Sequence, residues 1–159
     1  MLAFFLVEIL TRLMFPMFDP TGNLVFENKS GFVQLEHKNS YRRQSKNSGD
    51  YNVSVYSNSF GFRDNDEPNG FNEDTIFAIG DSFTFGWGVE ESQRFSDLLQ
   101  KKLETQLIIN VAMPTDIIGY QAIVKYLRDN DIEIKNSIIG ICMENDIVNY
   151  YSDIKDKND

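Results

Sequence analysis

The sequence predicts an α/β fold built on a small parallel sheet, because three apolar runs alternate with two segments of helical spacing. The expected strands are 75–79, 107–111 and 137–143, and the expected helices are 93–103 and 117–127. Strand-helix-strand connections of this length give right-handed crossovers and parallel strands. The third run is apolar throughout, which is typical of a strand covered on both faces.

Capping residues mark where the two predicted helices begin. In the first helix, apolar residues recur at helical spacing from Phe95 to Leu103, and Ser92 is the expected N-cap. In the second helix, Thr115 or Asp116 is the expected cap.

The segment before the first predicted strand differs in composition, being rich in Asn, Ser, Gly and charged residues. Alternating stretches at 32–35 and 51–56 are typical of short strands joined by turns. Residues 38–50 are predicted to form an exposed polar loop.

The chain therefore divides into four parts. These are an apolar helix (1–18), an irregular β-containing segment (19–72), the α/β domain (73–151) and a charged tail expected to fray (152–159).

Residues 1–18 are strongly apolar but contain Glu8, Arg12 and Pro16, and their longest uncharged run is shorter than the roughly 20 residues that span a bilayer. Two interpretations remain open. The segment is a shortened membrane anchor, which we favour because an exposed apolar helix needs a partner surface, or an amphipathic helix packed on the domain.

Composition excludes several classes of function. A net charge of −9 over 159 residues argues against nucleic-acid binding. The single cysteine, Cys142, cannot form an internal disulfide and is expected in the core. One cysteine and one histidine provide no set of zinc ligands, so no metal is expected.

Residues 80–86, Gly-Asp-Ser-Phe-Thr-Phe-Gly, follow the first predicted strand directly. Ser82 is thus placed on a turn at the carboxyl end of a strand, where chemistry gathers in α/β sheets. A phosphate-binding loop is excluded because the glycine spacing is wrong and no lysine follows. The Gly-x-Ser-x-Gly nucleophile elbow is excluded because Thr84 replaces its last glycine.

Residues 58–64 and 79–90 closely resemble the first block of the SGNH, or GDSL-type, hydrolases, in particular their bacterial and often membrane-anchored branch. The resemblance extends over roughly residues 51–150. It implies a flavodoxin-like parallel core, hydrolysis of ester bonds through a serine nucleophile, and no cofactor.

The resemblance assigns a role to residues of three blocks. Ser82 would be the nucleophile, supported by Gly80 and Asp81 in its own block. Thr115 stands where the family has a glycine whose backbone N–H binds the oxyanion; alternatively, it only caps a helix. Asn145 matches the family asparagine whose amide is another oxyanion donor, and Asp146 follows it; alternatively, both belong to a polar turn.

The family's general base is the histidine of an Asp-x-x-His block, and no such block follows Asp146 here. The only histidine, His37, has no aspartate three residues before it and is expected to be a loop residue. We therefore expect a core that is incomplete at its C-terminus and weak or absent activity of this chain alone. The third strand would lie at a sheet edge, which favours self-association or pairing with a missing C-terminal segment.

The expected function is that of an O-acyl or O-acetyl esterase acting on a small ester or an acylated carbohydrate. An O-acyltransferase for a cell-envelope polysaccharide would use the same residues. A non-catalytic binding remnant of the family, or a fragment whose downstream part is separate, would explain the missing histidine. The expected location is the membrane or cell envelope, and otherwise the cytoplasm.

Overall fold

A parallel three-stranded sheet lies at the centre of the chain, as the sequence predicts. The computed structural model describes residues 4–7, 9–10, 23–46 and 49–147. The strands are β5 (Ile76–Gly80), β6 (Ile108–Asn110) and β7 (Asn136–Gly140), in the order β6-β5-β7. Both pairings are parallel, and Ile76 lies opposite Ile108 on one side and Asn136 on the other. The carboxyl ends of all three strands therefore meet at one edge.

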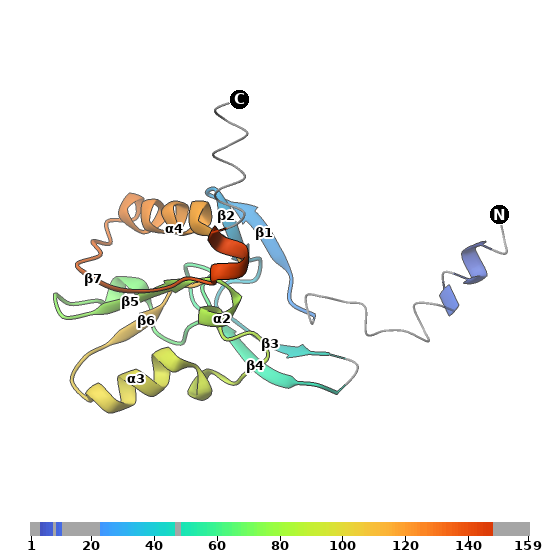
Figure 1. The fold of residues 1–159 in the computed structure, drawn as a ribbon, viewed down its shortest axis with the longest axis horizontal. Helices are drawn as coiled ribbons and strands as arrows, with labels where there is room; N and C mark the ends of the chain where they lie inside the picture. Colours follow the sequence, from blue (N-terminus) through green and yellow to red (C-terminus); the bar gives the residue numbers. More distant parts are fainter. Residues whose placement is uncertain (1–3, 8, 11–22, 47–48, 148–159) are drawn as a thin grey trace, which may run out of the picture.

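Two helices cover the sheet from opposite faces: α4 (Ile117–Asp129) lies on one face and α3 (Phe95–Leu103) on the other (Figure 1). The Asp116 carboxylate accepts the Gly119 backbone N–H at 3.0 Å, so Asp116 is the N-cap of α4. This confirms one of the two predicted caps.

The start of α3 differs from the prediction. A short 3-10 helix, η3 (Glu91–Gln93), precedes it, and the side chains of Glu90 and Gln93 form a capping box. The N-cap of α3 is Arg94, so the prediction of Ser92 as N-cap is wrong. The physical reason is that Glu90 begins an earlier turn, which places Ser92 inside that turn.

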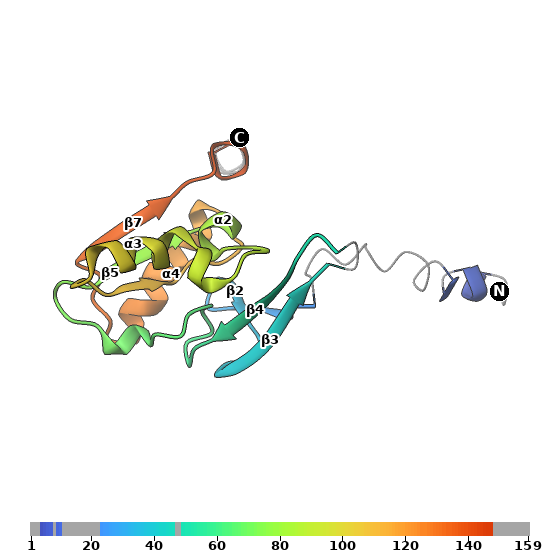
Figure 2. The ribbon, with the colours of Figure 1, turned by 90° about the horizontal axis from the view of Figure 1, so that it is seen from below.

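Two antiparallel hairpins precede the sheet (Figure 2): β1 (Phe26–Lys29) with β2 (Phe32–Leu35), and β3 (Ser40–Ser45) with β4 (Asn52–Ser57). The strands predicted at 32–35 and 51–56 match β2 and β4. The loop predicted at 38–50 is wrong over β3. Only Gln44 is buried in β3, so its polar sequence lacks the apolar alternation that signals a strand. The short 3-10 helix η2 (Pro68–Gly70) follows β4.

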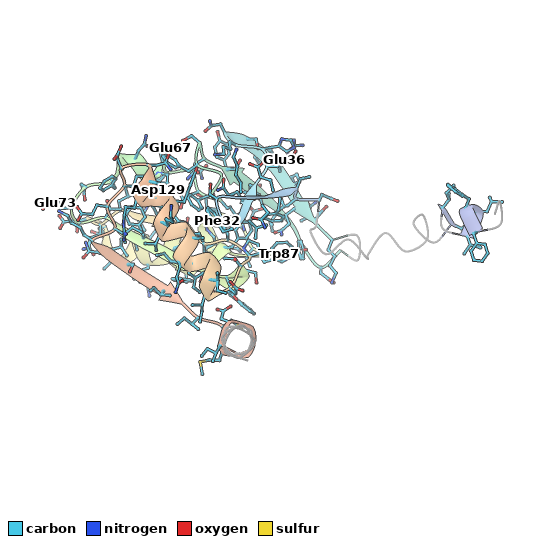
Figure 3. The ribbon with its side chains drawn as sticks, turned by 90° about the horizontal axis from the view of Figure 1, so that it is seen from above. Phe32, Glu36, Glu67, Glu73, Trp87 and Asp129 are labelled. Atoms are coloured by element: carbon cyan, nitrogen blue, oxygen red, sulfur yellow. The ribbon has the colours of Figure 1, made fainter. Side chains whose placement is uncertain are left out.

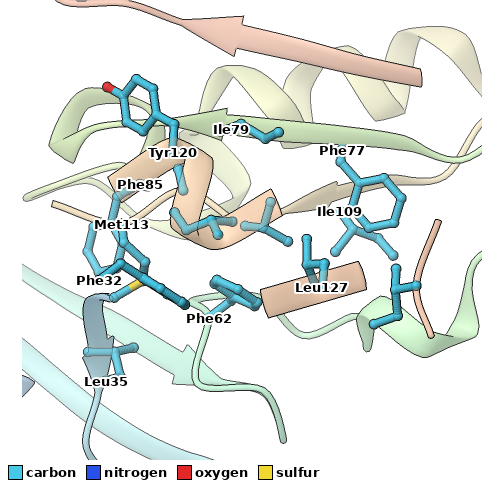
Figure 4. Packing of buried hydrophobic residues seen from close by; sticks show 14 of the residues in the cluster. Phe32, Leu35, Phe62, Phe77, Ile79, Phe85, Ile109, Met113, Tyr120 and Leu127 are labelled. Carbon is cyan, nitrogen blue, oxygen red and sulfur yellow. The ribbon is translucent and has the colours of Figure 1, made fainter. Parts of the chain in front are cut away.

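One hydrophobic core joins the N-terminal hairpins to the sheet (Figure 4). Phe77 and Ile79 of β5 pack in it with Leu127 of α4, and Phe32 of β2 and Phe62 come from the N-terminal segment. The rings of Phe32 and Phe62 stack with centroids 5.9 Å apart. The N-terminal segment is therefore packed as part of the same globule.

The strand β7 is exposed, contrary to the prediction of a strand covered on both faces. In the described part of the chain β5 is its one neighbour, which confirms the predicted edge position, and Ile139 is 56% exposed. The strand ends at Gly140, three residues before its predicted end, and a single π-helical turn, η4 (Met143–Ile147), begins where the strand was predicted to end. Cys142 is half-buried rather than a core residue.

Of the predicted apolar helix, residues 4–7 and 9–10 are helical and exposed. The rest of 1–18 lies outside the described residues, as does the predicted tail 152–159. Among the described residues, no helix has the length and apolar character needed to cross a bilayer.

Candidate active site at the end of strand β5

Ser82 follows β5 after a single intervening residue and begins the one-turn helix α2 (Ser82–Phe85). The turn is closed at both ends. The Asp81 carboxylate accepts the Phe83 N–H at 3.0 Å, and Gly86 ends the helix with a φ of 82°, a conformation that favours glycine. The motif thus places a half-buried serine at the edge where the three strands end.

Thr84 holds this turn against the sheet. It is buried between Gly80 of β5 and Gly140 of β7, and a Cβ on either glycine would overlap its Oγ1. The threonine that excludes the Gly-x-Ser-x-Gly elbow therefore has a packing role of its own. Gly80 supports Ser82 by leaving room for Thr84.

The second block runs alongside the Ser82 turn. The backbone N–H of Met113 donates to the Gly80 carbonyl at 3.1 Å. The Asn110 amide donates to the Thr84 carbonyl at 2.8 Å and to the Ser96 hydroxyl at 3.0 Å. Asn110 therefore links β6, α2 and α3 through one buried side chain.

A cavity of about 540 Å³ opens beside Ser82, and Pro114 of the second block lines it as well. The remaining lining residues are mostly apolar: Phe83, Gly86, Trp87 and Val89. Its volume falls in the range of roughly 300–1,000 Å³ that small-molecule sites occupy. Residues predicted from two separate blocks thus share one pocket.

Trp87, which lines this pocket, is held in place by residues of the N-terminal segment. Trp87, labelled in Figure 3, stacks on Phe26 with ring centroids 6.1 Å apart, and its indole N–H donates to the Tyr51 hydroxyl at 3.1 Å. The Gly88 N–H donates to the buried Gln44 amide oxygen at 3.0 Å. Sequence reasoning missed these residues because the contacts join positions more than 35 apart.

Thr115 follows Pro114 and packs its side chain over Gly119, where a Cβ would overlap the threonine Oγ1. Its φ is not positive, so the backbone at this position accommodates a β-branched residue. Among the described residues, no hydrogen-bond partner occupies the backbone N–H of Ser82 or that of Thr115. Thr115 itself is not among the residues that line the cavity at Ser82, so the roles of the two N–H groups as oxyanion donors stay predictions.

The third block meets the first through a buried acidic pair. Asp146 is fully buried, and its Oδ2 accepts the Tyr120 hydroxyl at 2.6 Å and the Cys142 N–H at 2.9 Å. Burial raises the pKa of Asp81, and the nearby Asp146 raises it further. Among the described atoms, Asp146 Oδ1 and Asp81 Oδ2 have no hydrogen-bond partner.

Tyr120 is the donor that ties this third block to α4. The pKa of Tyr120 is raised mainly by burial and next by the hydrogen bond to Asp146, so its hydroxyl stays protonated. The backbone of Asn145 lies in η4, but its side chain is outside the described part of the chain. Its role as an oxyanion donor therefore stays a prediction.

The motif segment 58–64 acts as a scaffold behind the site. The buried guanidinium of Arg63 donates to the carbonyls of Ser54 at 2.8 Å and Val89 at 2.7 Å, and to that of Gly86. Burial, together with the neighbouring Arg94, lowers the pKa of Arg63 to about 10, which leaves it charged at neutral pH. The loop after Ser82 is thus fixed to β4.

His37 lies away from the Ser82 pocket. It pairs with Glu36 at 3.6 Å and lines a separate small cavity with Leu24 and Val55. In the described part of the chain, no imidazole or carboxylate hydrogen-bonds to the Ser82 hydroxyl, and no group of three acidic, histidine or cysteine side chains is placed to hold a metal.

Comparison of the chain with protein-family models, with curated proteins and with solved structures gives no significant match. The site is therefore defined by its geometry. Ser82 lies on a turn capped at both ends, Pro114 lines the same cavity, and Asp146 is near enough to raise the pKa of Asp81.

Proposed function

We propose that this chain is an SGNH-type serine ester hydrolase, in which Ser82 attacks the carbonyl of a small O-acyl or O-acetyl ester. One observation carries the proposal: Ser82 and Pro114 of the second motif block line the same largely apolar cavity at the carboxyl edge of the sheet. Such a cavity suits an acyl group, while the edge supplies backbone donors.

The reaction would be acyl transfer through a covalent intermediate. The Ser82 Oγ forms a bond to the ester carbonyl carbon while its proton passes to a base, and the resulting oxyanion collapses as the alcohol leaves with a proton. Water then releases the acid from the acyl-serine. The N–H groups of Ser82 and Thr115 and the Asn145 amide would bind the oxyanion, each worth about 3–4 kcal/mol.

Among the described residues, the proposed mechanism has no general base beside Ser82. The chain has a single histidine, His37, and it lines another cavity. A serine hydroxyl without a base is a poor nucleophile, although an oxyanion hole alone retains part of the catalysis. We therefore expect slow turnover that an external base accelerates.

Chemical rescue tests the proposal. Hydrolysis of p-nitrophenyl acetate is followed for the wild type and for Ser82→Ala, with and without added imidazole, and the rate without protein is subtracted. We expect a low serine-dependent rate that rises several-fold with imidazole in the wild type alone. Equal rates for both proteins under both conditions would contradict the nucleophile and favour a binding remnant of the family.

An O-acyltransferase would differ only in the acceptor. The same assay, repeated with a soluble sugar as acceptor, separates the two reactions because transfer yields an acylated sugar instead of the free acid.

A further inference from the structure

A second cavity, of about 420 Å³, lies between the β3–β4 hairpin and the start of α3. Its lining combines two tyrosines with acidic and amide side chains, among them Tyr41, Tyr56, Asn65, Glu90, Glu91 and Gln100. None of these residues lines the cavity at Ser82. The roles assigned to the motif blocks therefore leave this cavity unexplained.

The two tyrosines form an aromatic pair across the hairpin. Tyr41 of β3 lies directly opposite Tyr56 of β4 in the strand register. Their residues are 55% and 42% exposed, which is high for large aromatic side chains. The Tyr41 hydroxyl is within hydrogen-bonding distance of Ser54 Oγ at 3.2 Å and of Arg43 at 3.4 Å, so its ring is oriented before any ligand binds.

The acidic side chains of the cavity are held in place by donors of the protein. Glu90 accepts the Ser54 N–H at 3.1 Å, and Glu91 accepts the Asn65 amide at 2.6 Å. Arg94, which is buried, pairs with Glu91 at 3.6 Å. Asp97, a third carboxylate of the lining, pairs with the same arginine at 2.8 Å, so the cavity is acidic and its carboxylates are held by protein donors as fixed hydrogen-bond acceptors.

Donors are present beside these acceptors. The side-chain oxygen of Gln100 accepts the Ile108 N–H at 2.6 Å, so the NH₂ group is the part of this lining side chain that can donate to a ligand. Lys101 also lines the cavity. A ligand here meets aromatic faces together with both donors and acceptors.

We propose that this cavity binds a neutral saccharide. Sugar rings present apolar C–H faces that pack on aromatic side chains, and hydroxyl groups that need a donor and an acceptor each. The cavity supplies both kinds of contact, and its volume is that of a small-molecule site. The binding itself does not depend on the chemistry of Ser82.

The place of the cavity suggests which part of a substrate it would hold. Val89 lines the Ser82 pocket and the next residue, Glu90, lines this cavity, so the two sites are adjacent along the chain. If the proposed esterase activity holds, a saccharide bound here would be the carbohydrate portion of an acylated substrate. This last step rests on the proposed function.

Calorimetric titration of the full chain with uncharged hexasaccharides tests the proposal. Cellohexaose, xylohexaose and chitohexaose are used as probes, each up to 10 mM. We expect at least one to bind, and expect Tyr41→Ala and Tyr56→Ala to weaken that binding at least tenfold. Tyr56→Phe keeps the aromatic face and is expected to lose less than threefold. Arg42→Ala, an exposed change on the same strand but outside the lining, is the matched control.

If an alanine variant folds poorly, NMR chemical-shift mapping of the saccharide on the wild-type protein locates the binding site without any variant. Shifts confined to the hairpin and to residues 90–101 would support the proposal. It is overturned if no hexasaccharide binds, if both alanine variants bind as the wild type does, or if spermine binds at the cavity and the saccharides do not. Hydrolysis of p-nitrophenyl acetate does not use this cavity, so either proposal can fail without the other.

Discussion

Asp64 joins the motif segment 58–64 to the central sheet. Its two carboxylate oxygens accept the backbone N–H of Asn110 at 2.6 Å and that of Asp66 at 2.9 Å, and Arg94 lies 3.7 Å away. Burial raises the pKa of Asp64 to about 7, while Arg94 and the two N–H donors limit the rise. The group is thus expected to change its charge near neutral pH.

A carboxyl pKa that is raised in the folded state makes the stability of the fold decrease as the pH rises. The protonated form of Asp64 favours folding, so its contribution is complete below the ordinary pKa of about 4 and is lost as the pH rises through about 7. Between these two pH limits, the contribution of Asp64 to the free energy of unfolding changes by on the order of 4 kcal/mol. We therefore expect the stability of the wild type relative to Asp64→Asn to fall between pH 4 and pH 8.

Urea unfolding at several pH values measures this difference. Asp129→Asn serves as the control, because it removes the same charge from an exposed aspartate of α4. A wild-type advantage over Asp64→Asn that grows with pH would show that the ionised form is the one that stabilises the fold.

At the scale of elements, the contact that fixes α2 to the sheet is steric. Gly140→Ala would bring a methyl group against Thr84 Oγ1, the one atom that a Cβ there would overlap. We expect a loss of about 1–3 kcal/mol, as for other overpacked cores. Thr84→Ala in the same chain should restore most of it, because the colliding atom is then absent.

Thermal unfolding of the two single variants and the double variant measures this coupling as a double-mutant cycle. Gly70→Ala, at a glycine where a Cβ meets nothing within 4 Å, is the matched control. Additive effects of the two changes would argue against the steric contact.

The elements that the sequence predicts well are those with a strong apolar period. The three parallel strands and α4 lie within a few residues of their predicted positions, because buried faces impose the pattern. β3 was missed because its pairing with β4, rather than its own side chains, makes it a strand. The edge position of β7 was predicted, whereas the exposure of its face was not, since an apolar run has the same pattern whether or not a second layer covers it.

The candidate site was predictable to the same limited degree. Ser82 and the second block follow from a local motif, and their shared pocket follows from the parallel strands. Trp87, Tyr120 and Gln44 act through partners far along the chain, and no local pattern reports such contacts. The pairing of the two tyrosines in the β3–β4 hairpin could not be predicted from the sequence either, because only the strand register places Tyr41 beside Tyr56.

At the scale of the whole molecule, Arg63 connects the N-terminal segment to the loop that follows Ser82. Arg63→Met keeps the length of the side chain but removes the guanidinium donor from the carbonyls of Ser54, Val89 and Gly86, of which Gly86 keeps the Val89 N–H. Because each buried bond to a charged group is worth about 1.5–3 kcal/mol, we expect a loss of at least 3 kcal/mol. Arg43→Met, at an exposed position, is expected to cost less than about 1 kcal/mol.

Urea unfolding followed by circular dichroism measures both variants, and limited proteolysis reports which part opens first. We expect the wild type to unfold in one transition, since one core spans both parts. Two separate transitions in the wild type, with Arg63→Met affecting neither, would mean that the segment is an independent unit.

Trp87 gives the molecule a spectroscopic probe at a useful place. It is the only tryptophan of the chain, it lines the pocket at Ser82, and it stacks on Phe26 of the first hairpin. Its emission therefore reports two events without any label: the entry of a ligand into the pocket, and the separation of the first hairpin from the indole ring. Quenching by acrylamide separates them, since a bound ligand shields the indole whereas departure of the hairpin exposes it.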